Sequence, residues 1–200
     1  MSAANTTRGA SGGFDLWSGL GRLEAELRSG GGRGAAPVER WNPPYCGDIG
    51  LAIGRDGTWF YRGSAIGRMP MVKLFASVLR RDDDGRHYLV TPVEKVDVSV
   101  EDAPFVAVEM EVLAQGRDQT IVVRTNVDDV VRIGDAHPMR FVCDEAGGFK
   151  PYVRVRGRLD ALFSRSLAYD LAQLFSADAT GRAGIWSGGT FYELDGPELA

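Results

Sequence analysis

Short runs in which apolar and polar residues alternate recur along most of the chain, and glycine-containing turns separate them. A period of two is typical of β-strands with one buried face, because successive side chains point to opposite faces of a sheet. In residues 49–62, two such runs flank Asp56-Gly57, a pair that favours a tight hairpin turn. The chain is therefore predicted to consist mainly of short strands that fold back on one another.

Two stretches interrupt the alternation with helical spacing. The first begins at Pro70, which suits a first helical turn, and its apolar face consists of Met71, Leu74, Phe75, Val78 and Leu79. The second has Asp160 or Ser164 available as a cap, and its apolar stripe consists of Phe163, Leu167, Leu171, Leu174 and Phe175. These patterns predict one amphipathic helix in each half of the chain.

The remaining alternating runs predict strands before and after these helices. They cover residues 88–91 and 93–100, a hairpin of 105–113 with 120–125 around Gly116, a pair of 139–143 with 152–158 across Gly147-Gly148, and a hairpin of 184–186 with 191–194. Tyr61-Arg62-Gly63 is echoed by Val155-Arg156-Gly157, which suggests duplication. We expect an α+β fold with two related halves, residues 37–102 and 103–200. Each half is predicted to be an antiparallel sheet or half-barrel with one packed helix.

The start of the chain differs in composition from this body. Residues 1–13 are polar and small and are expected to be disordered, whereas Leu16, Leu20, Leu23 and Leu27 predict a short amphipathic helix within residues 14–28. Residues 29–36 are rich in glycine and predict a flexible tether.

Charge and composition argue against several classes of protein. The net charge of −4 gives no general attraction to nucleic acid or to an anionic membrane surface. No apolar run approaches the roughly 18 residues of a membrane span, and the start lacks the layout of a signal peptide. Cys46 and Cys143 are too few for a disulfide scaffold and are expected to pack as small buried side chains. We therefore expect a cytoplasmic protein with no stable membrane insertion and no nucleic-acid partner.

The residue patterns of metal sites and of hydrolases are weak here. His87 and His137 stand alone in the sequence, so no metal or other cofactor is expected. Ser187 is flanked by glycine, but the helix that follows a nucleophile elbow is missing. Glu109 and Glu111 share one face of a predicted strand and could serve in acid–base chemistry, or could simply face solvent or arginines.

The most suggestive feature is a basic strand. The period of two places Tyr152, Arg154, Arg156 and Arg158 on one face, with Val153, Val155 and Leu159 on the other. Three guanidinium groups beside one aromatic ring could hold phosphate and stack a base. The alternative is a solvated face neutralised by Glu109 and Glu111. Arg62 and Arg68 flank the corresponding turn of the first half and could meet this row at a shared cleft.

Residues 37–194 resemble the bacterial family called domain of unknown function 1285. The segments that carry the resemblance are Trp41-Asn-Pro-Pro44, Gly47-Asp-Ile-Gly-Leu-Ala-Ile53, Asp56-Gly-Thr-Trp-Phe-Tyr61, Gly63-Ser-Ala-Ile-Gly-Arg68, Leu74-Phe75, Tyr88-Leu-Val-Thr-Pro-Val-Glu-Lys95 and Val100-Glu-Asp-Ala-Pro-Phe105. The resemblance implies a duplicated core, a second half like a pleckstrin-homology fold, a nucleotide-like ligand between the halves and a part in signal transduction. It implies no catalytic residues.

Three functions follow as hypotheses. The first is a non-enzymatic protein that binds a small anionic or nucleotide-like ligand, with Arg62, Arg68, Tyr152, Arg154, Arg156 and Arg158 as ligand-binding residues. The second is an adaptor that binds a signalling protein through a strand edge or through the helix of residues 14–28. The third is a hydrolase that uses Glu109, Glu111 or His137.

Overall fold

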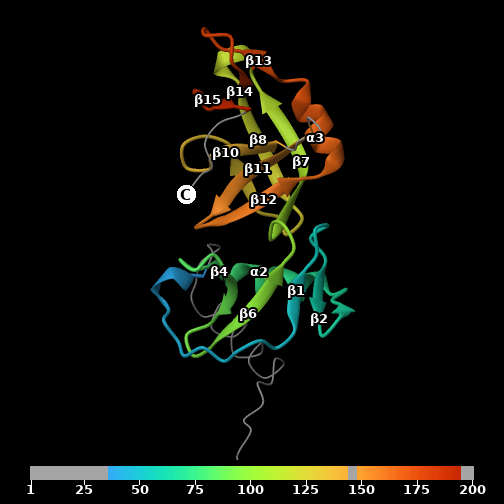
Figure 1. Ribbon diagram of the computed structural model, residues 1–200, viewed down its shortest axis with the longest axis vertical. Coiled ribbons are helices and arrows are strands. Elements are labelled where there is room, and N and C mark those ends of the chain that lie inside the picture. Colours follow the sequence, from blue (N-terminus) through green and yellow to red (C-terminus); the bar gives the residue numbers. More distant parts are fainter. Residues whose placement is uncertain (1–35, 144–147, 195–200) are drawn as a thin grey trace, which may run out of the picture. The chain divides into compact units, whose positions relative to one another are not determined.

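The computed structural model describes residues 36–143 and 148–194. The helix expected within residues 14–28 and nearly all of the tether expected at residues 29–36 lie outside the described residues, as does Gly147 of one expected turn. The described body contains two six-stranded sheets and one three-stranded sheet (Figure 1).

The first sheet arises from residues 51–100. Its elements are β1 (Leu51–Ile53), β2 (Trp59–Tyr61), β3 (Ser64–Ala65), α2 (Met69–Ser77), β4 (Leu79–Arg81), β5 (His87–Val90) and β6 (Lys95–Val100), and a short 3-10 helix, η1 (Val38–Arg40), precedes them. The strands lie in the order β3-β2-β1-β6-β5-β4, and β1 pairs with β6 in parallel. The helix α2 makes this order possible, because it carries the chain from one edge strand, β3, to the other edge strand, β4.

The second sheet arises from residues 105–163. Its strands are β7 (Phe105–Leu113), β8 (Thr120–Thr125), β9 (Val130–Arg132), β10 (Met139–Cys143), β11 (Phe149–Arg156) and β12 (Leu159–Phe163), with the 3-10 helix η2 (Gly116–Asp118) between β7 and β8. They lie in the order β10-β11-β12-β7-β8-β9, and β12 pairs with β7 in parallel. The helix α3 (Arg165–Ala172) and a sheet of β13 (Ser176–Ala177), β14 (Ala183–Ser187) and β15 (Thr190–Glu193) follow.

The two six-stranded sheets have the same topology. In each, three strands run outward from the centre to one edge, three run inward from the other edge, and the first and last strands meet as a parallel pair. This pattern confirms the duplicated α+β fold. Each sheet is antiparallel except for that central parallel pair. The sequence analysis predicted antiparallel sheets and no parallel pair.

The sequence echo that suggested duplication does not mark equivalent positions. Tyr61 ends β2, the second strand of its sheet, whereas Val155-Arg156 ends β11, the fifth strand of the other. The helices are also placed differently, since α2 follows the third strand and α3 follows the sixth. The repeat is therefore one of strand order, and the two short segments are not structurally equivalent.

Several boundaries differ from the predicted ones because apolar residues next to a helix can continue its stripe while belonging to a strand. Leu79 begins β4 and Phe163 ends β12, although both were assigned to helices. The cap of α3 is Ser164, whose Oγ accepts a hydrogen bond from the Leu167 N–H. Arg158 lies beyond the end of β11, in the turn that leads to β12.

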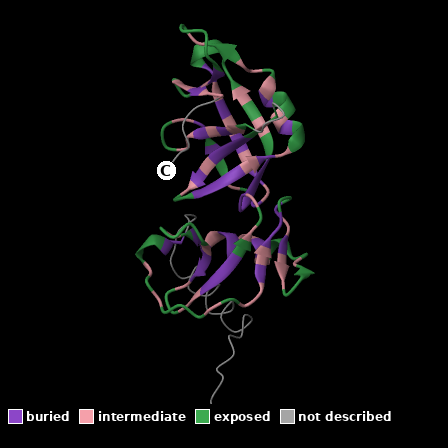
Figure 2. Cartoon of the chain, in the orientation of Figure 1, coloured by how far each residue is buried: buried purple, intermediate pink, exposed green. Residues whose placement is uncertain are grey.

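Each sheet buries its apolar side chains against the helix of its own half, and Figure 2 shows buried residues concentrated in the strands. In the first half the Trp59 and Phe75 rings stack with their centroids 5.7 Å apart, which places α2 on the sheet. In the second half Leu167 and Leu171 are the buried residues of α3. Leu167 and Leu171 belong to the predicted face of α3, as expected, but the buried face of α2 consists of Val72, Phe75 and Ala76, of which only Phe75 was predicted.

Ser187 joins the three-stranded sheet to the second six-stranded sheet. Its fully buried hydroxyl accepts a hydrogen bond from Ile121 N–H at 2.9 Å and donates to the Ile133 carbonyl at 2.8 Å. The Ser187 hydroxyl thus uses both its donor and its acceptor capacity in hydrogen bonds that hold the fold together. The two cysteines are exposed rather than buried, contrary to the prediction, because Cys46 lies in the loop before β1 and Cys143 ends β10.

The hairpin turn at Gly57 lies against the second half of the chain. Gly57 has a φ of +80°, and its carbonyl accepts a hydrogen bond from Asn126 Nδ2. Asn126 is held in place because its Oδ1 accepts from Val106 N–H at 3.0 Å. A Cβ at position 57 would lie 2.5 Å from Asn126 Nδ2, so glycine is required both by the backbone and by the neighbouring side chain.

We predict that Gly57→Ala lowers the free energy of unfolding by about 2–4 kcal/mol, which combines the cost of a left-handed residue with overpacking. Gly63→Ala is the matched control, since Gly63 has a φ of +79° and open space around its Cβ position. The control should lose only about 1–2 kcal/mol. Urea unfolding of both variants measures the difference, and equal losses would contradict the contact at Asn126.

Candidate functional site

The predicted basic strand is β11, and its polar face lies at the junction between the two halves. Tyr152 pairs with Leu162 and Arg154 with Asp160, and the register shifts between Arg154 and Arg156. Val153 and Val155 are buried on the opposite face, as predicted. Because Arg158 follows the strand, it is presented by a turn and does not extend the row.

Tyr152 is buried, and both its hydroxyl and its ring contact other side chains. Its hydroxyl donates to Asp102 Oδ1 at 2.6 Å, and the Arg140 guanidinium carbon lies 4.1 Å from the ring centroid. Burial, followed by the hydrogen bond to Asp102, raises the pKa of Tyr152 well above its ordinary value. Asp102 lies in the linker between β6 and β7, so this contact holds β11 against the linker and leaves no open ring face for stacking a base.

Arg154 and Arg156 bind partners within the protein. Arg154 Nε donates to Asp160 Oδ1 at 2.6 Å, and Asp160 also forms an ion pair with Arg140. Arg156 forms an ion pair with Asp129, and its Nη2 donates to the Ala76 carbonyl of α2 at 2.7 Å. The Arg156 side chain therefore crosses from the second half to the first.

Arg62 and Arg68 do not join this row. Arg62 is exposed at a φ of +50° in the turn between β2 and β3, where its guanidinium lies 5.2 Å from the centroid of the Tyr61 ring. Arg68 is the exposed cap residue at the start of α2. Neither lines the cleft described below, and of the six predicted residues Arg158 alone lines it.

Glu109 and Glu111 do not neutralise the basic strand, as the alternative interpretation had it. Glu109 forms an ion pair with Arg124 on the neighbouring strand, and Glu111 is exposed. The hydrogen bonds from Arg124 hold the pKa of Glu109 below its ordinary value. The partners of the basic residues are instead Asp129, Asp160 and, for Arg158, Asp83.

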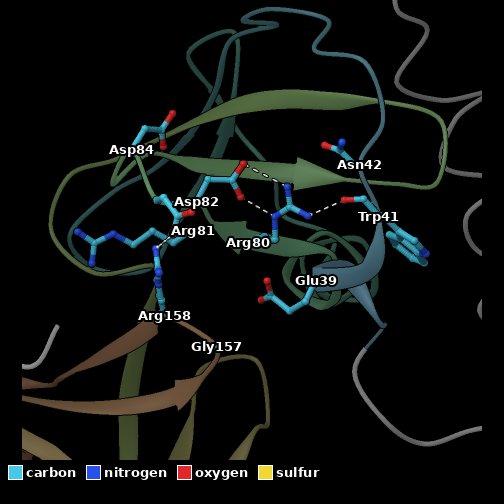
Figure 3. A pocket seen from close by; sticks show the side chains of 10 residues that line it. Glu39, Trp41, Asn42, Arg80, Arg81, Asp82, Asp84, Gly157 and Arg158 are labelled. Atoms are coloured by element: carbon cyan, nitrogen blue, oxygen red, sulfur yellow. Dashed lines mark hydrogen bonds and ion pairs between the residues drawn. The ribbon is translucent and has the colours of Figure 1, made fainter.

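A cleft of about 600 Å³ lies where the Gly157-Arg158 turn of the second half faces the first half (Figure 3). We call it the junction cleft. Its lining residues are Glu39, Trp41, Asn42, Arg80, Arg81, Asp82, Asp83, Asp84, Gly157 and Arg158. They come from η1 and the segment after it, from β4 and the turn to β5, and from the turn between β11 and β12. The junction cleft is thus assembled from both halves.

One side of the junction cleft is built on a buried ion pair. Arg80 is only 8% exposed, and its guanidinium donates to Asp82 and to the carbonyls of Val38 and Trp41. Lys95 also donates to Asp82, at 3.1 Å. Burial opposes ionisation of Asp82, but the hydrogen bonds from Arg80 and Lys95 outweigh it and lower the pKa of that carboxyl. Arg80 therefore fixes η1 and the chain after it to β4.

The remaining charged groups are less constrained. Arg81 Nε donates to the Gly85 carbonyl at 3.1 Å, and among the described residues its two terminal nitrogens have no acceptor. Gly157 has a φ of +48°, and a Cβ there would lie 2.9 Å from Glu39 Oε1. The indole of Trp41 points away from Arg158 (Figure 3). The junction cleft thus presents guanidinium donors, carboxylate acceptors and the Asn42 amide.

The sequence patterns did not single out Arg80, Arg81 or Glu39, which line the junction cleft. Arg80-Arg81 directly precedes Asp82-Asp83-Asp84-Gly85, a concentration of charge to which no function was assigned. This dense run of charged residues was the signal from which Arg80 and Arg81 could have been found. Glu39 had none, because it reaches the junction cleft only through the folding of η1 onto the first sheet.

The described residues contain neither a cluster of metal-ligand side chains nor a membrane-spanning helix. Within residues 36–143 and 148–194, no three histidine, cysteine or acidic side chains are grouped as metal ligands would be. Over the same residues, no helix combines the length and the apolar character needed to cross a bilayer.

Comparison with family models decides the relationship. Residues 36–103 match "Domain of unknown function (DUF1285), N-terminal domain", and residues 104–194 match "Protein of unknown function (DUF1285), C-terminal domain". The chain belongs to the DUF1285 family. No curated protein matches it. The two family models meet between residues 103 and 104, in the linker between the two six-stranded sheets.

The chain is similar to two solved structures of DUF1285 proteins. A DUF1285 family protein from Silicibacter pomeroyi DSS-3 is 48% identical, with a TM-score of 0.77, over 86% of this chain and 93% of that one. A second, from Shewanella baltica OS155, is 29% identical, with a TM-score of 0.49, over 62% of this chain and 91% of that one.

We predict that Arg156→Ala lowers the free energy of unfolding by about 2–3 kcal/mol, because it leaves the Ala76 carbonyl and Asp129 without their charged donor. Arg68→Ala removes an exposed arginine whose side chain has no hydrogen-bond or ion-pair partner among the described residues, and it should change the value by less than about 0.5 kcal/mol. Chemical denaturation of both variants tests this, and equal effects would show that Arg156 does not hold the junction.

His87 predicts a pH dependence of stability. Burial, followed by the positive charge of Arg81, lowers the pKa of His87 from 6.5 to about 4, while Asp160 opposes the shift. The unfolded chain then binds a proton at higher pH than the folded chain, so the free energy of unfolding falls as pH drops from about 6.5 to about 4. The contribution is at most about 3 kcal/mol, and solvent screening reduces it.

Urea unfolding between pH 4 and 7 measures this slope. His87→Gln should flatten it, and the same scan on His137→Gln controls for the loss of a histidine as such. An unchanged slope in His87→Gln would contradict the assignment.

Proposed function

We propose that this protein is a non-enzymatic sensor that binds a small phosphorylated, nucleotide-like molecule in the junction cleft. The observation that carries the proposal is that the lining brings guanidinium groups from both halves, Arg81 and Arg158, to one concave surface. A volume of about 600 Å³ lies within the range of small-molecule sites.

Arginine suits a phosphate group because its planar fork can donate two parallel hydrogen bonds to two oxygens. Arg81 has both terminal nitrogens available among the described residues, and the Arg158 side chain is 50% exposed. Arg80 is excluded from this role, since its donors are already bound to Asp82, Val38 and Trp41.

The acidic part of the lining favours a ligand that also carries hydroxyl groups. Three arginines and four carboxylates line the junction cleft, so it does not attract anions by net charge alone. Glu39 and the Asn42 amide can accept hydrogen bonds from sugar hydroxyls or from a base edge. A nucleotide or a sugar phosphate offers both phosphate oxygens and hydroxyl donors, and so complements the whole lining.

Binding to residues of both halves links occupancy to the contact between the halves. Such linkage is what a role in signal transduction requires, because a ligand shifts an equilibrium only through contacts that differ between two states. The carboxylates and the histidine considered for hydrolysis, Glu109, Glu111 and His137, are not among the lining residues.

The test is a thermal-shift screen of the full chain with nucleoside mono-, di- and triphosphates, cyclic nucleotides and sugar phosphates. A ligand at ten times its Kd stabilises by about 1.4 kcal/mol, which corresponds to an increase in Tm of about 3–6 °C. We predict that Arg158→Ala and Arg81→Ala each weaken binding at least about tenfold, as expected for a lost charged hydrogen bond.

Arg68→Ala is the control, because Arg68 is an exposed arginine outside the junction cleft. The proposal fails if no compound changes Tm at millimolar concentration, or if a detected shift survives in both cleft variants.

A further inference from the structure

The turn between β4 and β5 presents one of its three aspartates and anchors the other two. Asp82 N–H donates to the Arg86 carbonyl and Gly85 N–H to the Asp82 carbonyl, both at 3.0 Å, which closes the turn. The Asp82 carboxylate is bound by Arg80 and Lys95. The Asp84 carboxylate accepts hydrogen bonds from the Tyr88 hydroxyl at 2.6 Å and from Arg86 N–H at 2.9 Å.

Asp83 lies at the tip of this turn, with 93% of its side chain exposed, and it forms an ion pair with Arg158 of the second half. Arg158 is one of the two cleft arginines with hydrogen-bond capacity for a ligand. The Asp83 carboxylate thus already occupies part of the donor set that an anionic ligand would use.

We propose that Asp83 is an internal competitor that occupies Arg158 in the empty protein and sets the affinity for the anionic group of the ligand. The proposal rests on the function proposed above. A phosphate group replaces the Asp83 carboxylate on Arg158, and the turn swings aside to avoid repulsion between two anions.

The exchange is feasible because the Asp83–Arg158 pair is exposed, and exposed ion pairs are weak. The junction does not depend on it. Arg156 still donates to the Ala76 carbonyl, and Asn126 still donates to Gly57. Opening the pair therefore frees Arg158 without separating the halves.

Isothermal titration of the full chain with inorganic pyrophosphate, at low ionic strength, tests the proposal. Asp83→Asn keeps the size and the turn preference of the residue and removes its charge. We predict that it binds pyrophosphate about fivefold more tightly than the wild type, the ratio that corresponds to an exposed ion pair of about 1 kcal/mol.

Glu111→Gln is the matched control for net charge, because Glu111 is an exposed carboxylate outside the junction cleft. It should bind as the wild type does. Asp83→Asn combined with Arg158→Ala should lose the gain, since the competitor acts only through that arginine.

The possible outcomes separate the two proposals. If the wild type binds pyrophosphate and Asp83→Asn binds equally well, the internal competitor is wrong and the proposed site survives. If Glu111→Gln gains as much as Asp83→Asn, the effect is one of general charge, and the competitor is again wrong. If neither the wild type nor Asp83→Asn binds pyrophosphate at millimolar concentration, both proposals fail.

Discussion

The Arg156 guanidinium holds the two halves of this protein in register. It extends from the end of β11, lies 4.8 Å from the centroid of the Phe105 ring, forms an ion pair with Asp129 and donates to the carbonyl of Ala76 in α2. A partly buried charge of this kind needs all of its partners in place. The turn that follows it, Gly157-Arg158, is therefore carried to a fixed position against the first half. The junction cleft exists because that turn is fixed.

The two six-stranded sheets have the same strand order, but the helices lie at different places along the chain in the two halves. In the first half α2 connects the third strand to the fourth, whereas in the second half α3 comes after all six strands. The carbonyl that Arg156 binds belongs to α2. A helix between the third and fourth strands of the first sheet, which the second sheet lacks at that connection, thus supplies the carbonyl that joins the two halves.

The charges at the junction fall into two groups with different physical roles. Asp82, Asp102 and Asp160 are held by two or more donors each and shape the structure. Arg81, Arg158, Glu39 and Asp83 line the junction cleft with fewer constraints and can exchange partners with a ligand at lower cost. This division, rather than the number of arginines, is the basis for placing the proposed ligand in the junction cleft.

Local patterns in the sequence were sufficient for most of the longer strands, for most of the two helices and for the duplicated α+β class, but they missed β3, β4, β9, β12 and β13. Alternation marked β7 and β11, Asp56-Gly57 marked the first hairpin, and Ser164 capped α3 as one of two candidates. The same patterns misassigned Leu79 and Phe163, because an apolar residue at a helix boundary fits both periodicities. They placed Tyr152, Arg154 and Arg156 correctly on one face of a strand but could not identify what that face meets.

Only the tertiary structure showed which residues pair with Tyr152, Arg154 and Arg156. Arg156 pairs with Asp129, Arg154 pairs with Asp160, and the Tyr152 hydroxyl donates to Asp102, so the residues of this row all have partners within the protein. Glu39 reaches the turn at Gly157 through contacts between segments more than a hundred residues apart. Strand periodicity is local, since it depends on neighbouring residues along the chain. The pairing of charges depends on which distant segments packing brings within a few ångströms, and no local pattern encodes that.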